Sequence, residues 1–165
     1  MAIVYLALGS NVGDCQANLC QVVQLIEERI GSLISLSALY ETAPWGFTSS
    51  NAFLNSALKL ETTHTPTAIL EIAKRIEVEM GRTQKSKSEE YEDRIIDIDI
   101  LFYNNDIINE IDLIIPHPLL HLRLFVLEPL AEIASDFIHP VLHKSILQLY
   151  KTTLEKENPV NSEKY

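Results

Sequence analysis

The sequence has few of the features that mark membrane, secreted or nucleic-acid-binding proteins. No run approaches the roughly 18 uninterrupted apolar residues of a membrane span. The first residues lack a basic segment and a cleavage pattern, so we expect no signal peptide, no membrane partner and a cytoplasmic location. Basic residues are scarce: 13 Lys and Arg stand against 23 Asp and Glu, for a net charge of −10. This balance argues against a nucleic-acid partner bound by phosphate neutralisation.

Cysteine is limited to Cys15 and Cys20, which both fall in a stretch with helical periodicity. Five residues along a helix separate two Cα atoms by roughly 8 Å, which is too far for a disulfide. We therefore expect two buried, reduced thiols, as is usual in a reducing compartment.

The 165 residues, of which 47% are hydrophobic, suit one domain spanning residues 1–165, with a frayed tail after residue 157. The order of apolar patterns is strand, helix, strand, strand, helix, strand. The expected strands cover residues 3–8, 33–41, 53–60 and 94–103, and the expected helices cover 14–30 and 65–81. This order is typical of an α+β, ferredoxin-like βαββαβ core, in which helices pack on a mainly antiparallel sheet.

Additions to this core are expected after residue 103. Asn104 and Asn105 can adopt the positive φ of a tight turn, which predicts a hairpin whose returning strand covers residues 106–109. The apolar stretch that follows predicts C-terminal helices, one of them opened by Pro129 and the last at residues 145–155.

The most informative motif is IIDIDIL, in the last predicted core strand. Alternate residues of a strand share a face, so Ile96, Ile98 and Ile100 should enter the core while Asp97 and Asp99 lie side by side on the other face. Two adjacent carboxylates repel each other, and one or two Mg²⁺ ions with bound phosphate would offset that repulsion. The alternative is the solvated face of an edge strand, although Asp is a poor strand former.

Basic residues gather around this motif. Arg82 follows the glycine that ends the second predicted helix, and Arg94 directly precedes the aspartate strand. Guanidinium groups bind phosphate oxygens in bidentate fashion, so both are candidates to neutralise a transferring phosphoryl group. The alternative for Lys85 and Lys87 is an ordinary solvated loop.

Histidine and aromatic residues supply two further candidates. His117 and His121 are four residues apart, which would suit zinc on a helix, but the prolines on both sides of His117 disfavour a helix there. Phosphate contacts by His117 and Arg123 are the favoured alternative. The segment TAPWGFTSSNAFLNSAL offers aromatic surface and Asn55, which would hold a planar heterocycle, although such aromatics are as often core residues.

Six motifs occur in the order LALGSNVGD, YETAPWG, FLNSAL, IEVEMGR, DRIIDIDILFY and PHPLLHLRLFVLEPLAEIA. Together they resemble the 6-hydroxymethyl-7,8-dihydropterin pyrophosphokinase family of folate biosynthesis over residues 3–140. The resemblance implies an αβα sandwich that transfers pyrophosphate from ATP to the pterin hydroxymethyl group and releases AMP. It implies ATP and the pterin as partners, with two Mg²⁺ ions. We expect a monomer, since nothing in the sequence calls for an obligate interface.

The resemblance also implies roles for individual residues on the nucleotide side. Asp97 and Asp99 resemble the ligands of the two Mg²⁺ ions. Arg82 and Arg94 resemble arginines that reach the phosphates. The remaining implied nucleotide contacts are Glu77, His117 and Arg123.

On the pterin side, Phe53 and Phe125 resemble two aromatic walls that enclose the ring. Thr42 and Asn55 resemble the groups that contact its edge. The main chain is implied to help at Pro44, Trp45 and Gly46. The sequence departs from the family pattern G-R-x-R by reading Gly-Arg-Thr-Gln from residue 81, so Lys85 or Lys87 would substitute weakly for the second arginine.

Two alternatives belong to other classes. A nucleotidyltransferase also combines Gly-Ser with a DxD motif, but it holds the two close together, whereas Ser10 and Asp97 are far apart here. A ferredoxin-like ligand-binding module would not need paired aspartates beside two arginines, and it would not consume a nucleotide.

Overall fold

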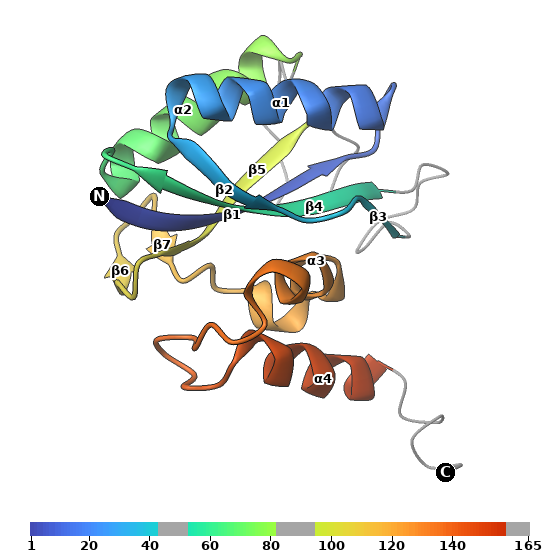
Figure 1. Ribbon diagram of the computed structural model, residues 1–165, viewed down its shortest axis with the longest axis vertical. Helices are drawn as coiled ribbons and strands as arrows, with labels where there is room; N and C mark the ends of the chain where they lie inside the picture. Colours follow the sequence, from blue (N-terminus) through green and yellow to red (C-terminus); the bar gives the residue numbers. More distant parts are fainter. Residues whose placement is uncertain (43–52, 82–94, 158–165) are drawn as a thin grey trace.

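The computed structural model describes residues 1–42, 53–81 and 95–157, and its centre is an antiparallel sheet (Figure 1). The central strand β1 pairs with β4 on one side and with β5 on the other, while β2 and β3 both pair with the far side of β4. The strands of this sheet are β1 (Ala2–Ser10), β2 (Ser32–Leu36), β3 (Tyr40–Thr42), β4 (Phe53–Thr62) and β5 (Asp97–Tyr103).

The sequence predicts one strand over residues 33–41, and the structure divides it into β2 and β3. The cause is Ser37, whose hydroxyl accepts a hydrogen bond from the Ala57 amide (2.9 Å) and lies 3.0 Å from the Ser56 hydroxyl. A side chain that takes over a backbone partner interrupts the regular ladder. The chain therefore bends at Ser37 and resumes pairing with β4 at Tyr40.

Helices α1 (Cys15–Arg29) and α2 (Pro66–Glu79) cover one face of the sheet (Figure 1). The predicted caps are confirmed, since Asp14 accepts from the Ala17 amide and Thr65 from the Ala68 amide. The core beneath these helices is made by alternate strand residues and by the inner stripe of each helix. Its fully buried members include Val4, Leu6, Leu58, Leu60, Ile26, Ile69, Ile76 and Ile96.

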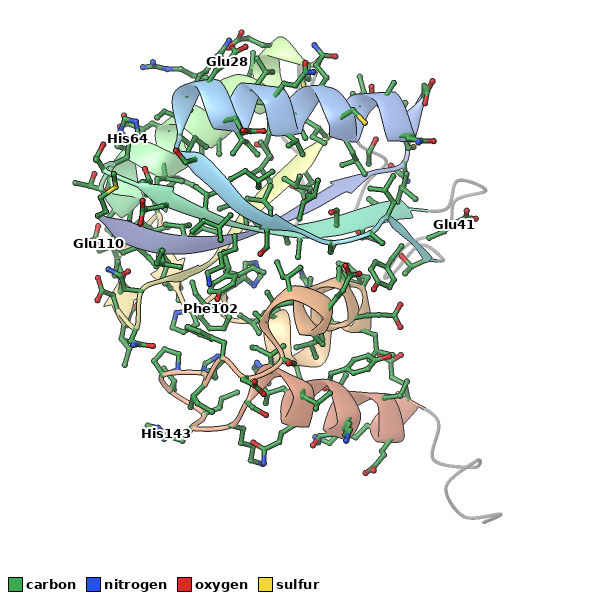
Figure 2. The ribbon with its side chains drawn as sticks, viewed as in Figure 1. Glu28, Glu41, His64, Phe102, Glu110 and His143 are labelled. Atoms are coloured by element: carbon green, nitrogen blue, oxygen red, sulfur yellow. The ribbon has the colours of Figure 1, made fainter. Side chains whose placement is uncertain are left out.

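Helices α3 (Leu124–Ala134) and α4 (Ile146–Glu157) lie on the opposite face, after a short 3₁₀ turn at Leu120–Leu122. Phe102 of β5 lies between the sheet and this layer (Figure 2). Pro129 lies inside α3, so the prediction that it opens a helix is wrong. The helix starts earlier because the Arg123 carbonyl accepts from both Val126 and Leu127, and the apolar burial of α3 outweighs the bond lost at the proline.

The predicted hairpin is also built differently. Strand β6 (Ile108–Asn109) pairs with β7 (Ile114–Ile115) and not with β5. Asn104 has the expected positive φ of 51°, but its amide donates to the Ile3 carbonyl and its Oδ1 accepts from the Ile3 amide. These two bonds hold the turn against β1, so the chain does not return along β5.

Cys20 is exposed and Cys15 is half-buried, and both are free thiols. The prediction of two buried thiols is therefore wrong, because the buried stripe of α1 runs through Leu19, Val22 and Ile26, which leaves Cys20 toward solvent and Cys15 only partly covered. Within the described segments, no helix has the length and apolar character needed to cross a membrane.

Candidate functional site

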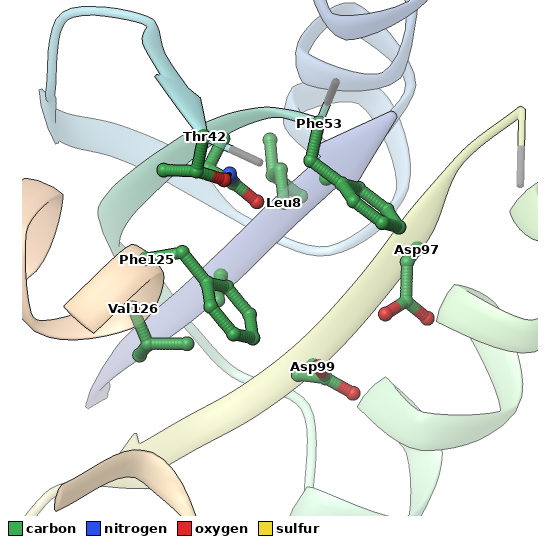
Figure 3. Close-up of a pocket in the computed structure, with 10 residues that line it drawn as sticks. Leu8, Thr42, Phe53, Asp97, Asp99, Phe125 and Val126 are labelled. Atoms are coloured by element: carbon green, nitrogen blue, oxygen red, sulfur yellow. Dashed lines mark hydrogen bonds between the residues drawn. The ribbon is translucent and has the colours of Figure 1, made fainter. Parts of the chain in front are cut away.

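A pocket lies between the sheet and the start of α3, on the face opposite α1 and α2 (Figure 3). Four strands of the sheet and helix α3 contribute to it. It encloses about 460 Å³, including the part that opens to solvent. The lining residues are Ala7, Leu8, Gly9, Thr42, Phe53, Asn55, Asp97, Asp99, Phe125 and Val126.

The floor of the pocket is the end of β1. Gly9 pairs with Asn55 on one side and with Asp97 on the other, and Ala7 pairs in the same way with Ala57 and Asp99. Because the central strand carries only small side chains here, space is left between its two neighbours. This floor was not predicted, although the decreasing size of alternate residues along β1, from Tyr5 through Ala7 to Gly9, is a signal for it in the sequence.

The aspartate side chains share the face that the strand period predicts. Ile98 and Ile100 are buried in the core beneath α1 and α2, whereas Asp97 and Asp99 line the pocket. Figure 3 shows both carboxylates on the side of the pocket formed by β5. Two carboxylates at an open pocket form a hard oxygen donor set, which fits Mg²⁺ with water and phosphate completing its shell.

Glu77 reaches this strand from α2. Its side chain is buried, and its Oε2 accepts a hydrogen bond of 2.9 Å from the Ile98 amide. Ile98 lies between the two aspartates, so Glu77 holds the backbone that carries them. A buried carboxylate that accepts a backbone amide is a strong, directional contact.

Polar groups close the opposite wall. The Asn55 side chain is 4% exposed, and its Nδ2 donates a 2.8 Å hydrogen bond to the Thr42 hydroxyl oxygen. This bond fixes the orientation of the amide and directs its Oδ1 toward Gly9. The Thr42 hydroxyl hydrogen is then available for an acceptor. The wall thus offers one acceptor and one donor on adjacent strands.

Two aromatic rings project into the same pocket, Phe53 from β4 and Phe125 from α3 (Figure 3). The guanidinium carbon of buried Arg123 lies 5.6 Å from the centroid of the Phe125 ring. This is within the range of a cation–π contact. The arrangement suits a flat ligand placed between apolar rings and a polar wall.

A second pocket adjoins the first along the outer edge of β5. It encloses about 630 Å³, including open solvent, and Asp99 belongs to both pockets. His117 lines it, and burial together with the nearby Arg123 charge lowers the pKa of this imidazole to about 4, against an opposing contribution from Asp97. His117 is therefore neutral near pH 7. The other lining residues are Leu70, Ile98, Ile100, Ile111, Asp112, Leu113, Ile114 and Pro118.

The structure thus brings together four of the predicted pterin-side residues with both predicted metal ligands, and His117 lines the second pocket together with Asp99. His121 lies elsewhere, near His139 in the C-terminal layer. Among the described residues there is no group of three or more His, Cys, Asp or Glu suited to a metal ion. The remaining predicted residues lie outside the described ranges: Pro44, Trp45, Gly46, Arg82, Lys85, Lys87 and Arg94.

Comparison with known proteins places this site in a family context. The family model described as 7,8-dihydro-6-hydroxymethylpterin-pyrophosphokinase (HPPK) matches residues 5–135. A 2-amino-4-hydroxy-6-hydroxymethyldihydropteridine pyrophosphokinase of Porphyromonas gingivalis is 45% identical over 141 residues, which are 85% of this chain and 95% of the relative. A protein of the same name from Bacillus subtilis is 42% identical over 135 residues, which are 81% and 79%.

The fold is also found among solved structures. The crystal structure of Plasmodium falciparum HPPK-DHPS, wild type with pteroate, matches with a TM-score of 0.80 at 20% identity. The match covers 97% of this chain, but this chain spans only 46% of that one. At this identity the likeness concerns the fold alone.

Proposed function

The chain belongs to the 7,8-dihydro-6-hydroxymethylpterin-pyrophosphokinase family, and we infer from this membership which part of each substrate its two pockets bind. The enzyme is an ATP-dependent pyrophosphokinase of folate synthesis, which transfers pyrophosphate from ATP to the hydroxymethyl group of the dihydropterin. One observation carries the assignment of the site: Asp97 and Asp99 open into the same pocket as Phe53 and Phe125.

We assign the core to the ferredoxin-like fold. The chain order β1-α1-β2-β4-α2-β5 and the sheet order β2-β4-β1-β5 support this assignment. With α3 and α4 on the second face, the molecule is an αβα sandwich whose first pocket lies between the sheet and its second helical layer.

The pterin is assigned to the first pocket. Its flat ring would lie between Phe53 and Phe125, where the apolar contact does not depend on hydrogen-bond direction. The Asn55 Oδ1 would accept from a ring N–H or amino group, and the Thr42 hydroxyl would donate to a ring acceptor. We include main-chain contacts to the pterin from Pro44, Trp45 and Gly46, which are supported by the sequence resemblance alone.

The triphosphate is assigned to the junction of the two pockets, because Asp99 lines both. Asp97 and Asp99 would hold two Mg²⁺ ions, which would neutralise phosphate charge and align the β-phosphorus for attack by the hydroxymethyl oxygen. His117 and Arg123 would contact the nucleotide, with Arg82 and Arg94 reaching the phosphates. Glu77 would act on this side by fixing β5 through Ile98.

The protein's own contribution is alignment and exclusion of water. Pyrophosphoryl transfer needs little covalent chemistry from side chains when the two substrates are held in line and charge is neutralised. We also propose that the enzyme works as a cytoplasmic monomer without nucleic acid, and the net charge of −10 supports the last point.

The test is AMP formation from ATP and Mg²⁺, with and without 6-hydroxymethyl-7,8-dihydropterin. We expect pterin-dependent AMP from the wild-type chain, a loss of at least about 10³-fold in Asp97→Ala and Asp97→Asn, and full activity in Asp106→Asn, an exposed acid at the turn after β5. Release of diphosphate in place of AMP would indicate a nucleotidyltransferase. Folded protein that consumes no nucleotide would support the binding-module alternative.

A further inference from the structure

Glu132, on α3, makes a contact outside both pockets that bears on the shape of the first. Its Oε1 accepts a 2.6 Å hydrogen bond from the Tyr40 hydroxyl, and both carboxylate oxygens lie 3.2 Å from the Ala38 amide that donates to them. Tyr40 begins β3 and Ala38 lies just before it. The carboxylate therefore connects the start of β3 to α3. The same bond raises the pKa of the Tyr40 phenol to about 12.

Both connected elements continue from this contact into the pocket. In β3, Thr42 follows Tyr40 by two residues, so the two side chains share one face of the strand. In α3, Phe125 precedes Glu132 by seven residues, which is two turns along one face of the helix. Thr42 and Phe125 both line the pocket. The contact at Glu132 thus lies at one end of two elements whose other ends both line the pocket, on the side away from Asp97 and Asp99 (Figure 3).

We propose that Glu132 is a positioning residue for the pterin subsite: by holding Tyr40 and Ala38 it sets the spacing between β3 and α3, and so between Thr42 and Phe125. The proposal rests on the proposed function, because it takes the first pocket to be the pterin site. Asp97 and Asp99 belong to β5, on the other side of β1, whereas the hydrogen bonds of Glu132 described above go to Ala38 and Tyr40. Its effect should therefore fall on the pterin and not on ATP.

The chain supplies a matched control on the same helix. Glu128, one turn before Glu132, accepts a 2.9 Å hydrogen bond from the Tyr150 hydroxyl. This is the same type of carboxylate–tyrosine contact, but it joins α3 to α4, and Glu128 acts on Tyr40 of β3 only through its charge. Removing Glu128 therefore tests what the loss of such a bond does to the helix in general.

The experiment compares Glu132→Ala, Glu132→Gln and Glu128→Ala by steady-state kinetics, calorimetric binding of the pterin in the presence of a nonhydrolysable ATP analogue, and Tm. We expect Glu132→Ala to raise KM and Kd for the pterin by about three- to tenfold, with KM for ATP unchanged. The effect is modest because Glu132 is exposed. Glu132→Gln should restore pterin affinity, because Oε1 alone reaches both donors.

Glu128→Ala should lower Tm by about as much as Glu132→Ala does, but it should not raise KM for the pterin. Equal pterin KM values in Glu132→Ala and Glu128→Ala would overturn the proposal, as would a parallel rise of KM for both substrates or no rescue by Glu132→Gln. If the wild-type chain forms no pterin-dependent AMP, the proposed function fails and this proposal fails with it. The wild-type assay thus separates the two failures, since an active wild type with unaffected variants contradicts only the role of Glu132.

Discussion

Gly9 and Asn55 face each other across β1 and β4 so closely that a β-carbon at position 9 would lie 3.2 Å from the Asn55 Oδ1. The same carbon would lie 3.7 Å from Cδ1 of Phe53. Gly9 has no positive φ that would demand glycine, so the requirement comes from the pocket and not from the backbone. An absent side chain on the central strand keeps the proposed pterin acceptor in place.

Gly9→Ala should therefore weaken pterin binding. The added methyl group would displace the Asn55 Oδ1 from the position that the Thr42 bond fixes, and we expect KM for the pterin to rise by about tenfold while KM for ATP stays unchanged. The measurement is a double-mutant cycle with Asn55→Ala. Because the glycine acts through the amide, the two changes should be far from additive. Additive effects on KM would show that position 9 acts by another route.

Glu77 should affect Mg²⁺ binding indirectly, because it holds the backbone of β5 that carries Asp97 and Asp99. Glu77→Ala leaves the Ile98 amide without this acceptor, which we expect to cost about 1–3 kcal/mol of unfolding free energy and to raise the Mg²⁺ concentration needed for half-maximal AMP formation. Glu77→Gln keeps an acceptor oxygen, so its unfolding free energy and its Mg²⁺ requirement should both be close to those of the wild type. Urea unfolding and Mg²⁺ titrations would check this. An unchanged Mg²⁺ requirement in Glu77→Ala would mean that β5 is held without Glu77.

Lys85 and Lys87 stay candidates for the arginine that the family pattern contains and this sequence lacks. Replacing both by Ala should raise KM for ATP by about threefold at low salt and less at high salt, because dissolved ions screen the attraction between lysine and phosphate charges. The matched control is Lys151→Ala with Lys156→Ala, which removes the same charge from exposed positions on α4. Unaltered turnover and ATP binding in the Lys85→Ala, Lys87→Ala double variant would show that neither lysine takes the role of the missing arginine.

Local patterns predicted much of this molecule. The period of two in β5 gave the correct faces of Asp97 and Asp99, because that relation depends only on the strand itself. The caps at Asp14 and Thr65 were predictable for the same reason: each bonds to an amide three residues away. The pterin-side residues were named through family resemblance, and the sheet order explains why Thr42, Phe53 and Asn55 lie together.

What the sequence did not reveal depends on distant partners. The break between β2 and β3 arises from Ser37 bonding to β4, twenty residues away in sequence. The hairpin prediction failed because Asn104 bonds to Ile3 across 101 positions. Glu132 is separated from Tyr40 by 92 positions, and nothing in its local sequence distinguishes it from other exposed helical glutamates. Such contacts follow only from the assembled sheet and helices.

His139 lies in the C-terminal layer and links stability to pH. Its side chain is 4% exposed, its Nδ1 accepts from the amides of Val141 (3.1 Å) and Leu142 (3.0 Å), and its ring contacts Phe102 edge-on. Burial, reinforced by the nearby His121 and His143, lowers its pKa to about 4. Protonation of Nδ1 would remove the acceptor for both amides, so the fold keeps this imidazole neutral.

The sign of the effect follows from linkage. The pKa of His139 is lower in the folded chain than its ordinary value of 6.5, so between these values the unfolded chain binds a proton that the folded chain does not. The stabilisation is present above about pH 6.5 and is lost as pH falls toward 4. Allowing for screening by solvent around the neighbouring imidazoles, we expect about 1–2 kcal/mol less unfolding free energy at pH 4.5 than at pH 7.5 from this group.

His139→Asn isolates that contribution. The Asn oxygen can accept from the same amides but cannot be protonated, so the variant should lose less stability than wild type between pH 7.5 and pH 4.5 in urea unfolding. The control is His143→Asn, at an exposed position with φ of 58°, a conformation that Asn tolerates well. This control should keep most of the wild-type pH dependence. If His139→Asn and wild type lost stability in parallel on acidification, the acid sensitivity of the fold would reside in other groups, and burial of His139 would carry no linkage of this size.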